Sequence, residues 1–154
     1  MEDKPKRKII RLQNFDYATP RPYFITIRAR NKEPLFLNEK LNQQIINCLI
    51  EEKRRSSFKI FAYCLMPNHL HLLLAPFREE ISVSRYIGAF KSRTTRMAWA
   101  FGVSGKLWQG RFHDHILRRR EDLKTIGQYI LDNPVRKGLV SRWQDYKFLG
   151  LLDG

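Results

Sequence analysis

Two apolar runs separated by only two residues constrain the fold of this chain more than any other feature. Residues 58–66 read FKIFAYCLM and residues 69–75 read HLHLLLA, with Pro67 and Asn68 between them. Runs of this length, rich in aliphatic and aromatic side chains and joined by a tight turn, predict the two antiparallel strands of a β-hairpin. The rest of the chain must therefore cover this hairpin.

Periodicity predicts further elements on each side of the hairpin. Apolar and polar side chains alternate over residues 23–30, which read YFITIRAR, and this alternation indicates a first strand. Asn38 is placed to cap a helix that runs to about residue 55. A second amphipathic helix covers about residues 82–101, and after a Gly-rich turn a fourth strand is expected at about residues 113–118.

A third helix is predicted from about Glu121 to about Asn133. Pro134 follows Asn133, and a proline disfavours the helical conformation in the residue before it. The order β-α-β-β-α-β followed by an additional helix is the ferredoxin-like arrangement. The sequence therefore predicts an α+β fold with an antiparallel sheet.

The chain is about one domain long, at 154 residues. We expect a basic N-terminal arm over residues 1–20, a catalytic core over residues 21–140 and a C-terminal tail over residues 141–154. No apolar run is long enough to span a membrane, and no signal-peptide core follows the first charges. A cytoplasmic protein is therefore expected.

Net charge is the most informative aspect of the composition. The 29 Lys and Arg residues against 15 Asp and Glu residues give a formal charge of +14. Such an excess favours a polyanionic partner, above all a nucleic acid. A basic surface without a partner is the plain alternative, and an anionic membrane fits less well because no helix combines a basic face with an exposed apolar face.

The hairpin carries two histidines two positions apart, His69 and His71. Side chains alternate between the faces of a strand, so both imidazoles share one face while Leu70, Leu72 and Leu74 share the other. Two neighbouring imidazoles can bind one metal ion, but such a pair can equally form a hydrogen-bonded cluster. The spacing alone leaves both interpretations open.

Two imidazoles leave the coordination of a metal incomplete, so a third ligand should come from elsewhere. His113 and His115 form a second pair of this kind, and four converging histidines would suit zinc. Alternatively, Asn133 lies four residues after Tyr129 on one face of the predicted third helix. An amide oxygen beside two imidazole nitrogens would suit Mg²⁺ or Mn²⁺ better than structural zinc.

Three segments together, MPNHLHLLL, WQGRF and YILDNPVRKGLV, resemble the REP-associated tyrosine transposases. This family is a branch of the single-tyrosine HUH endonucleases, and the resemblance runs from the first strand to about Val140. It implies that His69 and His71 are metal ligands, that Asn133 is the third ligand and that Tyr129 is the catalytic nucleophile. The histidines at 113 and 115 are not part of the family's catalytic set.

The resemblance also implies an activity. It is that of a metal-dependent single-stranded DNA endonuclease and strand transferase, which cuts REP-type palindromic hairpins through a 5′-phosphotyrosine intermediate. Mg²⁺ or Mn²⁺ would be the cofactor, no nucleotide cofactor would be needed, and a monomer is expected rather than a dimer. The protein would work in the bacterial cytoplasm in association with the nucleoid. The alternative is a domesticated, catalytically weak protein that only binds DNA hairpins.

The candidate DNA-binding residues are cations, which would contact phosphates, and one tryptophan, which would stack on an unpaired base. Each cation could instead be a solvated surface charge, and the tryptophan could belong to the core. These candidates are Lys91, Arg93, Arg96, Trp108, Arg111, Arg118, Arg136 and Lys137.

Overall fold

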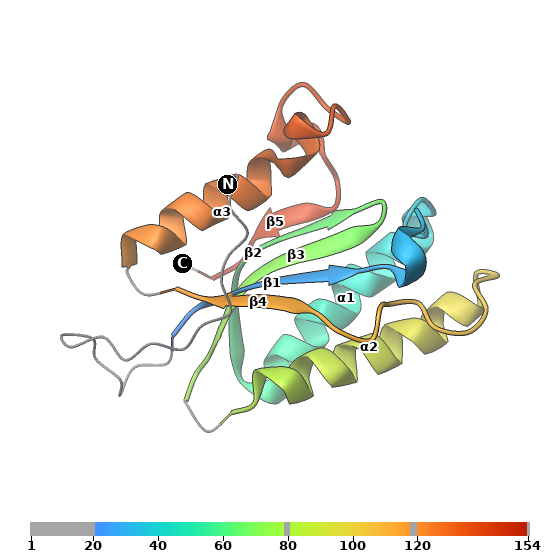
Figure 1. The fold of residues 1–154 in the computed structure, drawn as a ribbon, viewed down its shortest axis with the longest axis horizontal. Coiled ribbons are helices and arrows are strands. Elements are labelled where there is room, and N and C mark those ends of the chain that lie inside the picture. The colour runs from blue at the N-terminus through green and yellow to red at the C-terminus, as the bar shows by residue number, and fades with distance from the viewer. Residues whose placement is uncertain (1–20, 79–80, 118–119, 154) are drawn as a thin grey trace.

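The computed structural model describes residues 21–78, 81–117 and 120–153 (Figure 1). Its strands form one antiparallel sheet in the order β4-β1-β3-β2-β5. The strands are β1 (Tyr23–Arg28), β2 (Phe58–Met66), β3 (His69–Pro76), β4 (His113–Ile116) and β5 (Leu149–Leu151). The predicted hairpin of β2 and β3 is confirmed, and its register pairs Met66 with His69 across the turn.

Three α-helices cover the two faces of this sheet (Figure 1). The first two lie side by side on one face, and the third lies on the other. They are α1 (Glu39–Ser56), α2 (Val83–Trp99) and α3 (Arg120–Arg136), and two short 3-10 turns occur at Arg30–Lys32 and Trp143–Asp145. The predicted ferredoxin-like α+β fold with an additional helix is confirmed.

Local sequence explains where the first two helices begin. The side chain of Asn38 accepts hydrogen bonds from the backbone N–H groups of Lys40 and Leu41, at 2.9 and 3.1 Å. The hydroxyl of Ser82 accepts a bond from the N–H of Arg85 at 3.2 Å. Both side chains satisfy N–H groups that have no partner within the helix, as N-caps do.

Alternation along the strands divides the core into two layers. Leu70, Leu72 and Leu74 of β3 pack towards α1 and α2. Leu73 of β3 and Phe24 of β1 pack towards α3. Every residue of β3 is buried, as expected for a central strand covered on both faces. The histidines of β3 therefore lie between the sheet and α3.

The predicted end of the third helix is wrong, because α3 continues past Asn133 to Arg136 and includes Pro134. A proline costs a helix most in its interior, where it removes a backbone hydrogen bond, but Pro134 lies in the last turn. The helix is continued beyond it by the N–H of Lys137, which donates to the carbonyl of Asn133 at 3.0 Å. Gly138, at φ +74°, then ends the helix in a left-handed conformation.

Residues 141–153, expected to be a tail, contribute the edge strand β5. Ala62 of β2 pairs with Leu151, and the hydroxyl of Tyr146 donates to the carbonyl of Leu65 at 2.7 Å. A carboxylate oxygen of Asp153 accepts from the N–H of Ile60 at 2.8 Å. This segment is therefore tied along β2. Of the helices in the described ranges, none has the length and apolarity needed to cross a membrane.

Candidate active site

His69 and His71 lie side by side on the face of β3 that α3 covers. Their ring centroids are 4.5 Å apart, and each residue is only 8% exposed. Leu70 and Leu72, which alternate with them, belong to the opposite layer of the core. The predicted arrangement of the strand, with imidazoles on one side and leucines on the other, is confirmed.

The Nδ1 nitrogen of each imidazole is engaged by a polar side chain of the sheet or of the hairpin turn. His69 Nδ1 lies 2.8 Å from Asn68 Oδ1, and His71 Nδ1 lies 2.9 Å from Thr26 Oγ1. Because the amide oxygen of Asn68 can only accept, His69 carries its proton on Nδ1 and has its lone pair on Nε2. Nε2 of His69 is thus suited to bind a cation, and Nε2 of His71 is equally suited when the hydroxyl of Thr26 accepts the bond from Nδ1.

Both histidines are held in the neutral form. Burial lowers the pKa of His69 to about 4, and the positive charges of Arg28 and Lys137 act in the same direction. Burial also lowers the pKa of His71 well below its usual range, with further contributions from His69 and Arg136. Neutral imidazole is the form that binds metal ions, so the two rings have the protonation state that a cation site requires at neutral pH.

Asn133 reaches this pair from α3. Its side chain is 2% exposed, and its amide nitrogen lies 3.1 Å from Nε2 of His69. Its oxygen accepts a hydrogen bond from Arg136 at 3.3 Å. The two ends of an amide occupy nearly the same space, and a half-turn of this side chain would give up the bond from Arg136 and present the oxygen to His69 instead.

Tyr129 lies one helical turn before Asn133, at the half-buried edge of the site. Its ring centroid is 6.2 Å from that of His71 and 6.0 Å from that of Phe24. The guanidinium carbon of Arg136 lies 3.8 Å from the centre of the ring, close enough for a cation–π interaction. The tyrosine is therefore held by neighbours on several sides.

The second pair of histidines does not join the first. Thr26 of β1 pairs with His71 on one side and with His113 of β4 on the other, so a whole strand lies between the two pairs. Within residues 21–78, 81–117 and 120–153, no group of three or more His, Cys, Asp or Glu residues could hold a metal ion. The alternative of a zinc site with four histidines is contradicted.

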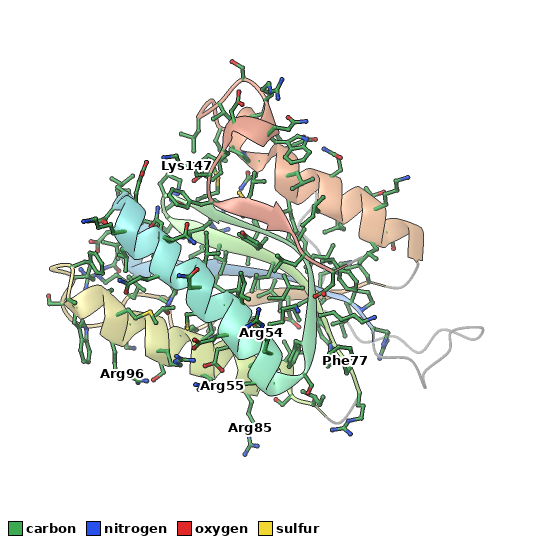
Figure 2. All side chains as sticks on the ribbon, turned by 180° about the vertical axis from the view of Figure 1, so that it is seen from behind. Arg54, Arg55, Phe77, Arg85, Arg96 and Lys147 are labelled. Carbon is green, nitrogen blue, oxygen red and sulfur yellow. The ribbon has the colours of Figure 1, made fainter. Side chains whose placement is uncertain are left out.

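The described cations that are expected to bind DNA lie in three places: at the end of α3 on one face of the sheet, on α2 on the other face, and just before β4. Arg136 and Lys137 are exposed at the end of α3, beside the histidines. Lys91 and Arg96 lie on α2, and Figure 2 shows Arg96 on the outer surface of that helix. Arg111 is exposed just before β4. Arg118 lies outside the described residues.

The prediction that Trp108 stacks on a DNA base is wrong. Trp108 is 2% exposed, and its indole N–H donates to the hydroxyl of Thr94 at 2.8 Å. Its ring packs on Phe36 and Phe90, with centroids 4.8 and 5.7 Å away. Trp108 is a core residue between the sheet and α2.

Arg93 has its charge engaged within the protein. Its guanidinium bonds to the carboxylates of Glu52 and Glu51 at 2.5 and 2.8 Å, which joins α2 to α1. Glu52 is itself buried. A phosphate would have to compete with two carboxylates for this cation, so the expectation that Arg93 contacts DNA loses its basis.

Sequence reasoning missed Arg28, which lies beside the histidines. Arg28 is the partner of His69 in the pairing of β1 with β3, and its charge contributes to lowering the pKa of both His69 and His71. The alternation in YFITIRAR places Arg28 on the same face as Thr26. The alternation therefore indicates the position of Arg28 only when the pairing of β1 with β3 is known.

Sequence and fold together place this chain among the transposases. The chain belongs to the family described as "Transposase IS200 like", whose model matches residues 22–133. That range includes both histidines, Tyr129 and Asn133.

Within the transposases, this chain is similar to REP-associated tyrosine transposases. The REP-associated tyrosine transposase of Escherichia coli (strain K12) is 29% identical over 126 residues, which cover 82% of this chain and 73% of that protein. The structure of a REP-associated tyrosine transposase bound to a REP hairpin aligns with a TM-score of 0.73 at 26% identity, over 91% of this chain and 82% of that one. The resemblance to this group of transposases is confirmed.

A more distant structure shares the fold alone. A Deinococcus radiodurans protein aligns with a TM-score of 0.56 at 19% identity, over 79% of this chain and 95% of that one.

Proposed function

We propose that this protein is a metal-dependent endonuclease and strand transferase that cuts single-stranded DNA at REP-type hairpins and becomes linked to it through Tyr129. The observation that carries the proposal is the meeting of Asn133 from α3 with His69 from β3, at 3.1 Å, with Tyr129 one turn away. A tyrosine next to a group of cation ligands fits covalent phosphodiester chemistry.

The donor set fits a hard divalent cation with open positions. Nε2 of His69, Nε2 of His71 and Oδ1 of Asn133 would hold Mg²⁺ or Mn²⁺, and the remaining positions would be left for water and phosphate oxygens. Both imidazoles are neutral, as ligands must be. When bound, the ion would offset the negative charge that develops on the phosphate during attack.

In the reaction, the phenolic oxygen of Tyr129 forms a bond to phosphorus, and the bond from phosphorus to the 3′ oxygen breaks. The proton of the phenol is lost to solvent, and the departing 3′ oxygen takes up a proton to become a hydroxyl. The product is a 5′-phosphotyrosine. Because it retains the phosphodiester energy, the strand can be rejoined without a nucleotide cofactor.

Arg136 and Arg28 would support this step from two sides. Arg136 stacks on the ring of Tyr129, so it holds the nucleophile and places a positive charge beside it. Arg28, opposite His69, would attract the phosphate. Fixed positive charges in a site of this kind stabilise the transition state more than they would in water.

The hairpin substrate is supported by the relative whose structure was solved with a REP hairpin. The net charge of +14 agrees with a nucleic-acid partner. The histidines, Asn133 and Tyr129 of one chain lie together, so we expect a monomer to complete the site. We place its work on chromosomal DNA in the bacterial cytoplasm.

A cleavage assay with a hairpin-bearing single strand, labelled at its 3′ end, tests the proposal. In Mg²⁺ or Mn²⁺ the wild type should give a labelled covalent protein–DNA adduct, and Tyr129→Phe should give none while still binding the hairpin. Tyr23→Phe is the matched control, because Tyr23 packs in the opposite layer of the core and should leave cleavage unchanged. Cleavage by Tyr129→Phe at the wild-type rate would refute the proposal. Binding without cleavage by the wild type would identify a hairpin-binding protein instead.

A further inference from the structure

A cavity on the other side of the sheet has no role in the proposed chemistry. It lies between the second half of α2 and the loop that leads to β4, and its volume is about 430 Å³. This volume falls within the range of roughly 300–1,000 Å³ that is usual for small-ligand sites. The side chains that give it its chemical character are Lys91, Arg96, Trp99 and Lys106.

The charges around this cavity are of one sign. Lys91, Arg96 and Lys106 contribute three cations, and none of the described residues that line the cavity is acidic. The ammonium of Lys91 donates to the carbonyl of Gln109 at 2.5 Å. Partial burial, together with the nearby charge of Lys106, lowers the pKa of Lys91. An anion placed between the two lysines would relieve this repulsion.

An exposed aromatic ring lies next to these cations. Trp99 is 54% exposed, although its indole N–H donates to the carbonyl of Gly105 at 2.9 Å. That bond fixes the edge of the ring against the loop. Arg30 holds the same loop by donating to the carbonyls of Ser104 and Lys106. The ring is therefore held in place with much of its surface in water, which suits stacking on a flat group.

The loop connects this cavity to the histidine site. The backbone of Gln109 accepts the bond from Lys91 on one side, and its N–H donates to the carbonyl of Arg28 at 2.8 Å on the other. Arg28 is in turn the strand partner of His69. In Figure 1 this loop runs from the end of α2 to β4, along the edge of the sheet. The lining of the cavity is therefore joined through Gln109 to the strand residue that lies opposite His69.

We propose that this cavity binds one unpaired nucleotide in the single-stranded flank of the hairpin substrate, with its phosphate between Lys91 and Lys106 and its base stacked on Trp99. This proposal takes its substrate, the hairpin, from the proposed function and rests on it in that respect. An unpaired nucleotide fits better than a duplex, because bases in a duplex are stacked on each other and cannot reach an aromatic side chain.

Binding of two oligonucleotides tests this site by fluorescence anisotropy. One is a blunt hairpin, and the other is the same hairpin with a single-stranded flank; both are measured in Tyr129→Phe protein, so that cleavage cannot interfere. Trp99→Ala and Lys106→Ala should each weaken binding of the flanked hairpin by about fivefold or more. They should weaken binding of the blunt hairpin by less than about twofold.

Two further variants serve as controls. Trp99→Phe keeps an aromatic ring and should retain most of the affinity for the flank. Arg54→Ala removes an exposed cation of α1 (Figure 2) that is not among the residues lining the cavity, and it should reduce both affinities equally and slightly. Thermal unfolding of each variant checks whether the fold is intact.

An equal loss for both oligonucleotides in the Trp99 and Lys106 variants would overturn the site, because it would indicate general attraction of a polyanion. Unchanged binding of the flanked hairpin would overturn it as well. These outcomes are independent of Tyr129: if the wild type fails to cut DNA, the comparison of the two oligonucleotides still decides whether the cavity binds the flank. If it cuts DNA but the comparison fails, only the cavity assignment is lost.

Discussion

Acidification of the metal-free protein should destabilise its fold in the range where histidines titrate. The pKa of His69 is lowered by burial from its usual value of 6.5 to about 4. In the unfolded chain this imidazole takes up a proton as the pH falls below its usual pKa, whereas in the folded protein it stays neutral until about pH 4. The unfolded state therefore binds more protons in this window, and stability falls as the pH falls.

The magnitude follows from the size of that shift. Each unit of pKa corresponds to about 1.4 kcal/mol, so His69 alone should remove about 2.5 kcal/mol of the free energy of unfolding between about pH 7.5 and about pH 4.5. His71 adds to the loss in the same direction, since burial lowers its pKa too. Carboxylates contribute mainly at lower pH: the pKa of Glu51, for example, is lowered by its bond to Arg93.

Urea unfolding in the presence of a chelator, repeated at several pH values, measures this loss. His69→Gln removes one of the two buried imidazoles and should reduce the dependence on pH between about 6.5 and 4.5, which leaves the part that His71 contributes. If the free energy of unfolding of the wild type is constant over that window, the histidines are not held neutral by burial. The conclusion that His69 and His71 are neutral at neutral pH because they are buried would then be wrong.

Two further predictions concern the third ligand and the core tryptophan. Addition of Mn²⁺ at neutral pH should raise the melting temperature of the wild type, and Asn133→Ala should weaken the apparent metal affinity by about tenfold or more. Gln128→Ala, on the exposed side of the same helix, should not, and an equal metal response in both variants would exclude Asn133 as a ligand. Trp108→Ala should cost about 3–5 kcal/mol in urea unfolding, because its ring fills the core. Trp99→Ala should cost less than about 1 kcal/mol, and similar costs for the two would contradict their assigned environments.

The hairpin and its histidines could be predicted because they depend on local pattern. Two strands joined by Pro67 and Asn68 have one simple pairing, and that pairing fixes which face carries His69 and His71. The spacing of Tyr129 and Asn133 on one helix is also a local property. These features remain visible in a single sequence because no distant residue is needed to define them.

Apart from the end of α3, which depends on local sequence, the errors and omissions concern features that distant residues decide. β5 is three residues long, and its strand conformation comes from pairing with β2 rather than from its own composition. Trp108 could be core or surface until α2 and Phe36 were placed around it. Arg28 is one of many arginines in the sequence, and only the pairing of β1 with β3 places it opposite His69.

The positive charges around the site oppose the binding of a metal ion and favour the binding of a DNA phosphate. Arg28, Arg136 and Lys137 disfavour protonation of the histidines, and by the same electrostatics they disfavour a divalent cation bound alone. A DNA phosphate would neutralise these cations and supply oxygen ligands at the same time. In the metal site that we propose, the ion and the scissile phosphate should therefore bind more tightly together than separately, because each removes a repulsion that opposes the other. Arg28, Arg136 and Lys137 would then allow the metal ion to bind tightly only when DNA is present.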